Sequence, residues 1–144
     1  MRAPFGKPPI WFWIVSRVFL LWACVGLFAF YSQVFDAAAI AALDDYDRHM
    51  LTSMPVWLKA VYGIATVAAA LGGVLLLARS ALARLVYLVS LVSIIVQFGY
   101  TLGATDLIAV KGFAAAAGFP IFIIAMGVVQ LWFARLATGR GWLR

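Results

Sequence analysis

The sequence predicts an all-α integral membrane protein: a four-helix bundle with both termini in the cytoplasm and a short interfacial helix between spans one and two. Three observations predict this fold. Apolar residues make up 67% of the 144 residues, charged residues make up only 11%, and the apolar residues gather into four long stretches. A water-soluble domain of this size cannot bury so much apolar surface, and a disordered chain would contain fewer aromatic residues than the 15% found here.

Each apolar stretch has the length that a membrane-spanning helix needs, because about 20 helical residues cross a hydrocarbon core about 30 Å thick. Helix breakers and charged residues bound the stretches: Pro8 and Pro9, Pro55, Arg79 and Ser80, Asp106, and Lys111 with Gly112. We therefore predict one transmembrane domain over residues 1–144, with spans at 10–35, 56–78, 82–104 and 113–137.

The charges outside the spans are distributed unevenly between the two sides. One side holds most of the basic residues: Arg2, Lys7, Arg79, Arg84, Arg135, Arg140 and Arg144. The other side holds every acidic residue (Asp36, Asp44, Asp45, Asp47 and Asp106), together with Arg48, Lys59 and Lys111. Basic loops remain in the cytoplasm, so we expect both termini to be cytoplasmic.

The segment 36–54 is the only sizeable connection between spans. Asp36 can cap a helix in which Ile40, Leu43, Met50 and Leu51 recur at near-helical spacing while the charged residues face elsewhere. This pattern predicts a short helix that lies on the lipid headgroups.

The composition also argues against several classes of function. The net charge of +6 comes from cations that flank membrane spans, so we expect no nucleic-acid partner. Cys24 is the only cysteine and His49 the only histidine, so we expect no disulfide, no metal and no cofactor, and we interpret His49 as a solvated loop residue. No nucleophile with a base and no phosphate-binding loop is present, so we expect no enzymatic activity.

Arg17 is the only charge well inside a predicted span. Seven residues after Ile10, it lies about 10 Å below the membrane surface. One interpretation is that its long side chain extends back to the headgroups. The other is an intramembrane polar contact, for which Gln130, at similar depth in the fourth span, is the nearest candidate.

Gln97 is the polar residue farthest from any span end, about 20 Å from the basic side by helix rise. Tyr100 and Thr101 follow it by about one turn on the same face of the third span. Hydrogen bonds between helices are one explanation for this polar stripe, and a pathway for a solute is the other.

Further polar and aromatic residues lie at similar depth near the acidic side, including Gln33 and Tyr62. Hydroxyl, amide and aromatic groups bind neutral polar solutes such as sugars. We therefore predict a ligand site formed by Gln33, Tyr62, Gln97, Tyr100 and Thr101. The alternative is an ordinary belt of interfacial aromatic residues.

Four short motifs carry a resemblance to a known family: residues 9–13 (PIWFW), 97–100 (QFGY), 131–135 (LWFAR) and 141–144 (GWLR). They resemble a family of small bacterial four-span membrane proteins that often carry the label "sugar transporter". The resemblance implies a bacterial inner membrane, with the segment 36–54 in the periplasm.

Three functions fit these observations. The first is an accessory or scaffold subunit that packs against a larger membrane complex, which the small-residue faces at Ala65, Ala69, Gly72 and Gly73 and at Ala114 and Gly118 would support. The second is a carrier or permease for a small polar, sugar-like solute, acting as an oligomer. The third is binding of a lipid or quinone near Arg17 and Trp22. The expected partners are membrane lipids and other membrane subunits or further copies of the chain.

Overall fold

The computed structural model describes residues 6–143, and it confirms the predicted fold class. The four long helices are α1 (Ile10–Val34), α4 (Val56–Leu77), α5 (Ala83–Gly103) and α7 (Phe113–Gly139). Each is long and apolar enough to cross a membrane, and each boundary lies within two residues of the prediction. Arg2 and Arg144, which contribute to the predicted orientation, lie outside the described residues.

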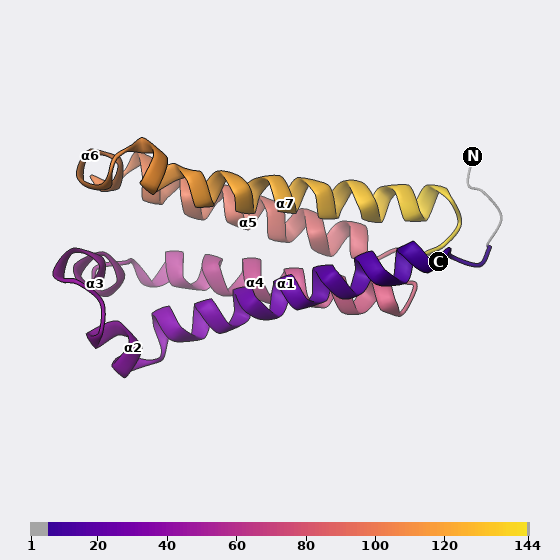
Figure 1. The fold of residues 1–144 in the computed structure, drawn as a ribbon, viewed down its shortest axis with the longest axis horizontal. Coiled ribbons are helices and arrows are strands. Elements are labelled where there is room, and N and C mark those ends of the chain that lie inside the picture. Colours follow the sequence, from indigo (N-terminus) through magenta and orange to yellow (C-terminus); the bar gives the residue numbers. More distant parts are fainter. Residues whose placement is uncertain (1–5, 144) are drawn as a thin grey trace.

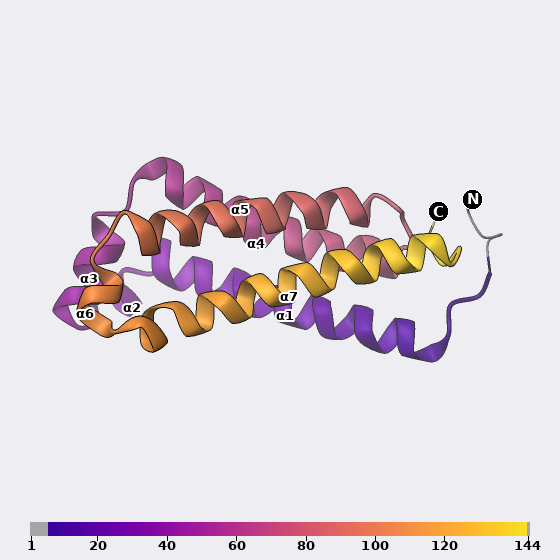
Figure 2. The ribbon, with the colours of Figure 1, turned by 90° about the horizontal axis from the view of Figure 1, so that it is seen from above.

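The long helices form an up-and-down bundle (Figures 1 and 2). At one end, which we call the terminal end, the segments 6–9 and 140–143 lie beside the α4–α5 connection. There the Gly6 N–H donates a hydrogen bond to the Gly141 carbonyl at 3.3 Å. The opposite end carries all five aspartates, and we call it the acidic end. Both described chain ends therefore lie on the same side of the bundle, as predicted; which side of the membrane this is remains a prediction.

The packing order of the helices follows the chain order. α4 packs against both α1 and α5, and α5 packs against α7. α1 and α7 close the ring mainly through aromatic rings, and they separate toward the acidic end (Figures 1 and 2). We call this contact the α1–α7 seam.

The α1–α7 seam is tightly packed only in its terminal half. The ring of Phe133 on α7 lies 5.8 Å from Trp11, 5.7 Å from Phe12 and 5.4 Å from Phe19, measured between centroids. Trp22 meets Phe122 at 5.5 Å farther along. Beyond this pair, toward the acidic end, no aromatic pair joins α1 to α7 within residues 6–143.

The terminal end holds a well-packed core. Phe12, Tyr87 and Phe133 are almost fully buried there, and so are Trp142 and Leu143 after the end of α7. Trp142 and Leu143 therefore fold back onto the bundle, which sequence periodicity did not indicate because these residues follow the last helix.

The segment 36–54 forms two short helices, where the sequence predicted one. α2 (Ala37–Ala41) begins at Asp36, whose side chain accepts hydrogen bonds from the backbone of Ala38 and Ala39. α3 (Asp45–Thr52) begins at Asp44, which accepts one from the Asp47 N–H at 2.8 Å. Asp36 is a cap, as predicted, but the helix that it caps ends after five residues.

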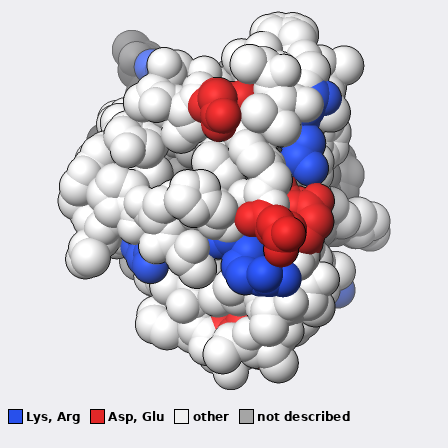
Figure 3. Space-filling model, turned by 90° about the vertical axis from the view of Figure 1, so that its left-hand side faces the viewer, with Lys and Arg blue, Asp and Glu red and all other residues white. Residues whose placement is uncertain are grey.

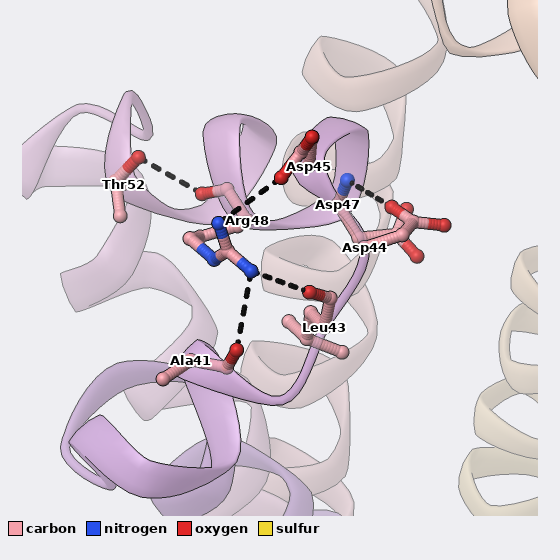
Figure 4. Close-up of polar contacts among 7 residues, drawn as sticks. All are labelled: Ala41, Leu43, Asp44, Asp45, Asp47, Arg48 and Thr52. Carbon is pink, nitrogen blue, oxygen red and sulfur yellow. Dashed lines mark hydrogen bonds and ion pairs between the residues drawn. The ribbon is translucent and has the colours of Figure 1, made fainter.

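Arg48 stabilises the turn between α2 and α3 (Figure 4). Its guanidinium donates to the carbonyls of Ala41 at 3.1 Å and Leu43 at 2.8 Å, and it pairs with Asp45 at 3.1 Å. These carbonyls have no partner within a helix, because the chain turns there, and Arg48 supplies one. A single continuous helix would lose these bonds.

A third short helix, α6 (Leu107–Lys111), precedes α7 and was not predicted. It ends at Gly112, whose φ of 86° lies in the left-handed region that glycine adopts without strain. α3 and α6 both lie at the acidic end of the bundle (Figure 1), and side chains of the two segments contact each other there. They therefore cover the part of the bundle where the sequence placed a ligand site.

Candidate functional site

Two adjoining cavities occupy the half of the bundle near the acidic end. The central cavity, of about 240 Å³, lies among α1, α4, α5 and α7. The acidic-end cavity, of about 330 Å³, lies between the bundle and α3. Gln33, Gln97 and Phe98 line both cavities, so the two spaces meet at these residues.

Gln97 is the polar group at the centre of this arrangement. It is only 6% exposed, and its side-chain amide makes no hydrogen bond with any residue in the described part of the chain. An amide carries two N–H donors and a carbonyl acceptor. No Gln97 atom is among the fully buried side-chain atoms that lack a partner, so the amide is open to the space of the cavities. A bound molecule or water in either cavity would supply the missing hydrogen bonds.

Tyr62 and Gln33, two further residues of the predicted ligand site, line the central cavity together with Gln97. Neither side chain hydrogen-bonds to another residue between 6 and 143. Thr66, which no sequence pattern indicated, also lines this cavity. Its hydroxyl donates to the backbone of its own helix, at 3.1 Å from both the Tyr62 and Gly63 carbonyls. The polar groups free to meet a ligand are thus two amides and a phenol.

The other walls of the central cavity are apolar. Trp22, Val25, Phe119 and Ile123 belong to these walls. Val25 on α1 is 63% exposed and Phe119 on α7 is 64% exposed, so the cavity reaches the molecular surface at the α1–α7 seam. An entrance on this face would open toward lipid.

The two remaining predicted residues, Tyr100 and Thr101, line the acidic-end cavity only. The Thr101 hydroxyl donates to the Gln97 carbonyl at 2.9 Å, and the Tyr100 ring stacks edge-on against Trp57 at 5.3 Å. The predicted site is therefore divided: Tyr62 belongs to the central cavity, Tyr100 and Thr101 belong to the acidic-end cavity, and Gln33 and Gln97 belong to both.

Two serines of α5, Ser90 and Ser93, precede Gln97 by two turns and one turn, and their hydroxyls bond to backbone carbonyls. The Ser90 hydroxyl donates to the Ala65 carbonyl of α4 at 2.8 Å and is fully buried. The Ser93 hydroxyl donates to the Val89 carbonyl of its own helix at 2.8 Å. The interpretation as an interhelical contact thus applies to Ser90, whereas Gln97 faces the cavities.

Ionic contacts join α3 to α6 at the acidic end, and we call them the α3–α6 latch. The Lys111 ammonium lies 3.3 Å from Asp44 and 3.9 Å from Asp47. The Tyr46 hydroxyl donates to Asp106 at 2.8 Å, and Lys111 also lies over the Tyr46 ring. The acidic end accordingly shows red and blue groups side by side (Figure 3). Asp47 also lines the acidic-end cavity, so the latch forms part of its wall.

Two groups of the α3–α6 latch titrate away from their ordinary values. The pKa of the Asp44 carboxyl lies below its usual 3.8, mainly because it accepts the Asp47 N–H, with a smaller contribution from Lys111. Burial raises the pKa of the Tyr46 phenol to about 12, and its hydrogen bond to Asp106 adds to the effect. The latch is therefore fully formed at neutral pH.

Arg17 and Gln130 form no hydrogen bond with each other in the described structure. Arg17 lies exposed on the surface of α1, whereas Gln130 is 2% exposed and its Nε2 has no hydrogen-bond partner in the described structure. Neither residue lines the central cavity, although Trp22 does. An exposed position suits a side chain that extends back to the headgroups.

His49 is exposed on α3. Within residues 6–143, no group of three or more histidine, cysteine, aspartate or glutamate side chains is arranged to hold a metal ion.

Comparisons of the chain with family models, with curated proteins and with solved structures find no match. The cavities and the residues that line them are therefore the features that bear on function.

Proposed function

We propose that the protein binds a small amphipathic molecule in the central cavity, without catalysing a reaction on it. Such a molecule has an apolar body and a head that forms hydrogen bonds, as a quinone does. One observation carries the proposal: Gln97 is only 6% exposed, makes no side-chain hydrogen bond within residues 6–143, and lines a mostly apolar cavity. The head would bond to Gln97, Gln33 and Tyr62, and the body would lie against Trp22 and Phe119.

The entrance supports a ligand that comes from the membrane. The α1–α7 seam is packed with aromatic rings only as far as Trp22 and Phe122, and the exposed Val25 and Phe119 line the cavity beyond them. A molecule dissolved in lipid would reach Gln97 through this opening without crossing the α3–α6 latch. We infer binding or facilitated movement, because the spans contain no acidic residue that could couple transport to protons or sodium ions.

Fluorescence quenching tests the proposal, because Trp22 lines the central cavity. The purified protein in detergent would be titrated with a short-chain quinone, which quenches tryptophan on contact. We expect saturable quenching that is lost in Trp22→Phe and weakened about tenfold or more in affinity in Gln97→Leu, the cost of about one good hydrogen bond to a buried group. The matched control is Ser93→Ala, on the same helix with its hydroxyl bonded to its own backbone.

The polar-solute hypothesis has support of its own in the acidic-end cavity, where Gln97, Tyr100 and Thr101 face one space. A hexose therefore belongs in the same titration. Saturable binding of glucose that depends on Tyr100, with no effect of the quinone, would replace the proposal by a carrier for polar solutes. No saturable effect of either probe would refute both.

An accessory role remains the second candidate, and one observation favours it. Ala114 and Gly118, four residues apart on α7, are exposed, and Gly118 has no atom within 4 Å of the position of a side chain. Another helix can pack closely on such a face. The small residues of α4 do not offer a similar surface, since Gly72 packs on Tyr87 and Gly73 on Leu20. Purification from native membranes in mild detergent tests this role, and a protein that migrates alone at its own mass would count against it.

We propose in addition that the protein lies in a bacterial inner membrane with the terminal end in the cytoplasm. The resemblance to small four-span bacterial proteins supports the compartment. The excess of basic residues at the terminal end supports the orientation.

A further inference from the structure

A third hollow lies at the terminal end of the bundle, away from the central cavity and the acidic-end cavity. A groove of about 730 Å³ runs between α5 and α7 at the terminal end, and we call it the α5–α7 groove. Arg84 and Arg135 line it from the two helices, together with Leu85, Leu88 and Leu131. It shares no residue with the two cavities near the acidic end.

The two helices present the same order of side chains to the α5–α7 groove. α5 leaves the terminal end, so Leu88 lies one turn, about 6 Å, deeper in the bundle than Arg84. α7 returns to the terminal end, so Leu131 lies one turn deeper than Arg135. Residues four apart lie on the same helix face. Each wall of the groove therefore carries an arginine at the rim and a leucine below it.

The arginines of the groove have no acidic partner. The Arg84 Nε is buried without a hydrogen-bond partner in the described structure. The ion pairs found within residues 6–143 involve only Lys111 and Arg48, and all five acidic residues of the chain lie at the other end of the bundle. Two cations thus face one groove with no acidic side chain of residues 6–143 beside them, and an anion bound there would be favoured.

We propose that the α5–α7 groove binds an anionic phospholipid. Its phosphate would lie between Arg84 and Arg135, because guanidinium groups bind phosphate oxygens through paired hydrogen bonds. One acyl chain would follow Leu85 and Leu88, which are 59% and 45% exposed. A free phosphate ion would contact the arginines only, whereas a phospholipid matches the whole order of side chains, with an arginine at the rim of each wall and a leucine one turn deeper. Basic sites between helices on the cytoplasmic side commonly bind such headgroups.

Native mass spectrometry tests this site on the full-length protein. The protein would be released from nanodiscs of phosphatidylcholine with phosphatidylglycerol, and the retained lipids counted. We expect phosphatidylglycerol to be retained over phosphatidylcholine, and each of Arg84→Gln and Arg135→Gln to lower that preference about fivefold. Arg84→Lys keeps the charge but loses the paired hydrogen bonds, so we expect it to lower the preference for phosphatidylglycerol less than Arg84→Gln does.

The matched control is Arg17→Gln, which removes an exposed arginine from α1, outside the groove. We expect it to retain phosphatidylglycerol like the unchanged protein. Arg135 is itself exposed, so Arg135→Gln should fold even if Arg84→Gln does not. Equal losses in Arg17→Gln and Arg135→Gln would show a general effect of charge and overturn the proposal.

An arm with inorganic phosphate separates the two possible sources of the anion. We expect millimolar phosphate, added to the protein in detergent, to raise the thermal unfolding temperature less than phosphatidylglycerol in mixed micelles does. An equal rise with both, each lost in Arg135→Gln, would identify a site for free phosphate and overturn the assignment to a lipid.

Discussion

Arg79 shows how one side chain organises the terminal end. It connects α4 to α5 with a φ of 59°, which costs a residue other than glycine about 1 to 2 kcal/mol. Its Nε donates to the Trp142 carbonyl at 2.9 Å and a terminal nitrogen donates to the Gly6 carbonyl at 2.7 Å. The strained turn is thus held by bonds to both terminal segments.

Replacing Arg79 separates the backbone strain from the hydrogen bonds. We expect Arg79→Ala to lower the free energy of unfolding by about 1.5 to 3 kcal/mol, because it removes two charge-assisted hydrogen bonds and keeps the strain. Arg79→Gly removes the same bonds but relieves the strain, so it should be about 1 kcal/mol more stable than Arg79→Ala. Unfolding in detergent measures both. Equal stability of Arg79→Ala and the unchanged protein would contradict the role of the bonds.

Gly72 and Gly99 form a matched pair of glycines for testing helix packing. A Cβ at Gly72 would lie 2.7 Å from the Tyr87 ring, and this ring is almost fully buried. We expect Gly72→Ala to cost about 1 to 3 kcal/mol, because neither α4 nor the ring can move freely. A Cβ at Gly99 meets nothing within 4 Å, so Gly99→Ala should be neutral or slightly stabilising. Thermal unfolding in detergent measures both variants. An unfolding temperature of Gly72→Ala that equals or exceeds that of Gly99→Ala would contradict the close packing of Gly72 on Tyr87.

At the scale of elements, the α3–α6 latch joins the two short helices that cover the acidic end. The pKa shifts of Asp44 and Tyr46 predict the pH range over which the latch is formed. Asp44 has a lowered pKa, so its contribution to stability is present above pH 3.8 and is lost as the pH falls below that value. Tyr46 has a raised pKa, so its contribution is present below pH 10 and is lost as the pH rises toward 12. The latch should persist between these limits.

Spin labels on α3 and α6 measure the state of the latch. In a Cys24→Ala background, labels at Thr52→Cys and Ala109→Cys should keep one narrow distance distribution from about pH 5 to about pH 9. We expect the distribution to broaden below about pH 4 and above about pH 10. Lys111→Met should broaden it at neutral pH. A transition between about pH 5 and about pH 9 would contradict the assignment of the latch to Asp44 and Tyr46.

At the scale of the whole molecule, the span boundaries were predictable because local chemistry marks them. Pro9 and Pro55 precede α1 and α4, and Gly112 precedes α7, as the sequence indicated. The division of 36–54 into α2 and α3 was not predictable. It depends on Arg48, whose side chain satisfies the Ala41 and Leu43 carbonyls only once the turn exists.

The sequence predicted the level at which the residues of the candidate site lie along the bundle, but not which way their side chains face. Helix rise placed Gln33, Tyr62 and Gln97 near one level, and the structure brings them to one cavity. The same reasoning paired Arg17 with Gln130, which form no hydrogen bond within residues 6–143. A span that is apolar on all sides carries no periodic signal of which face is buried, so depth alone cannot tell an exposed Arg17 from a buried Gln130. Phe119 and Thr66 become part of the cavity wall only because of the order in which the helices pack, and the sequence did not indicate this order.

The orientation of the whole bundle in the membrane can be tested by labelling. Gly6 bonds to Gly141, so both described chain ends must lie on one side of the membrane, and the basic residues there predict the cytoplasm. In a Cys24→Ala background, a membrane-impermeant maleimide should label Ala42→Cys, at the exposed end of α2, from outside intact cells. It should label the exposed Gly139→Cys only in inverted vesicles. The opposite pattern would reverse the orientation, and it would place Arg84 and Arg135 on the side where anionic lipid is scarcer.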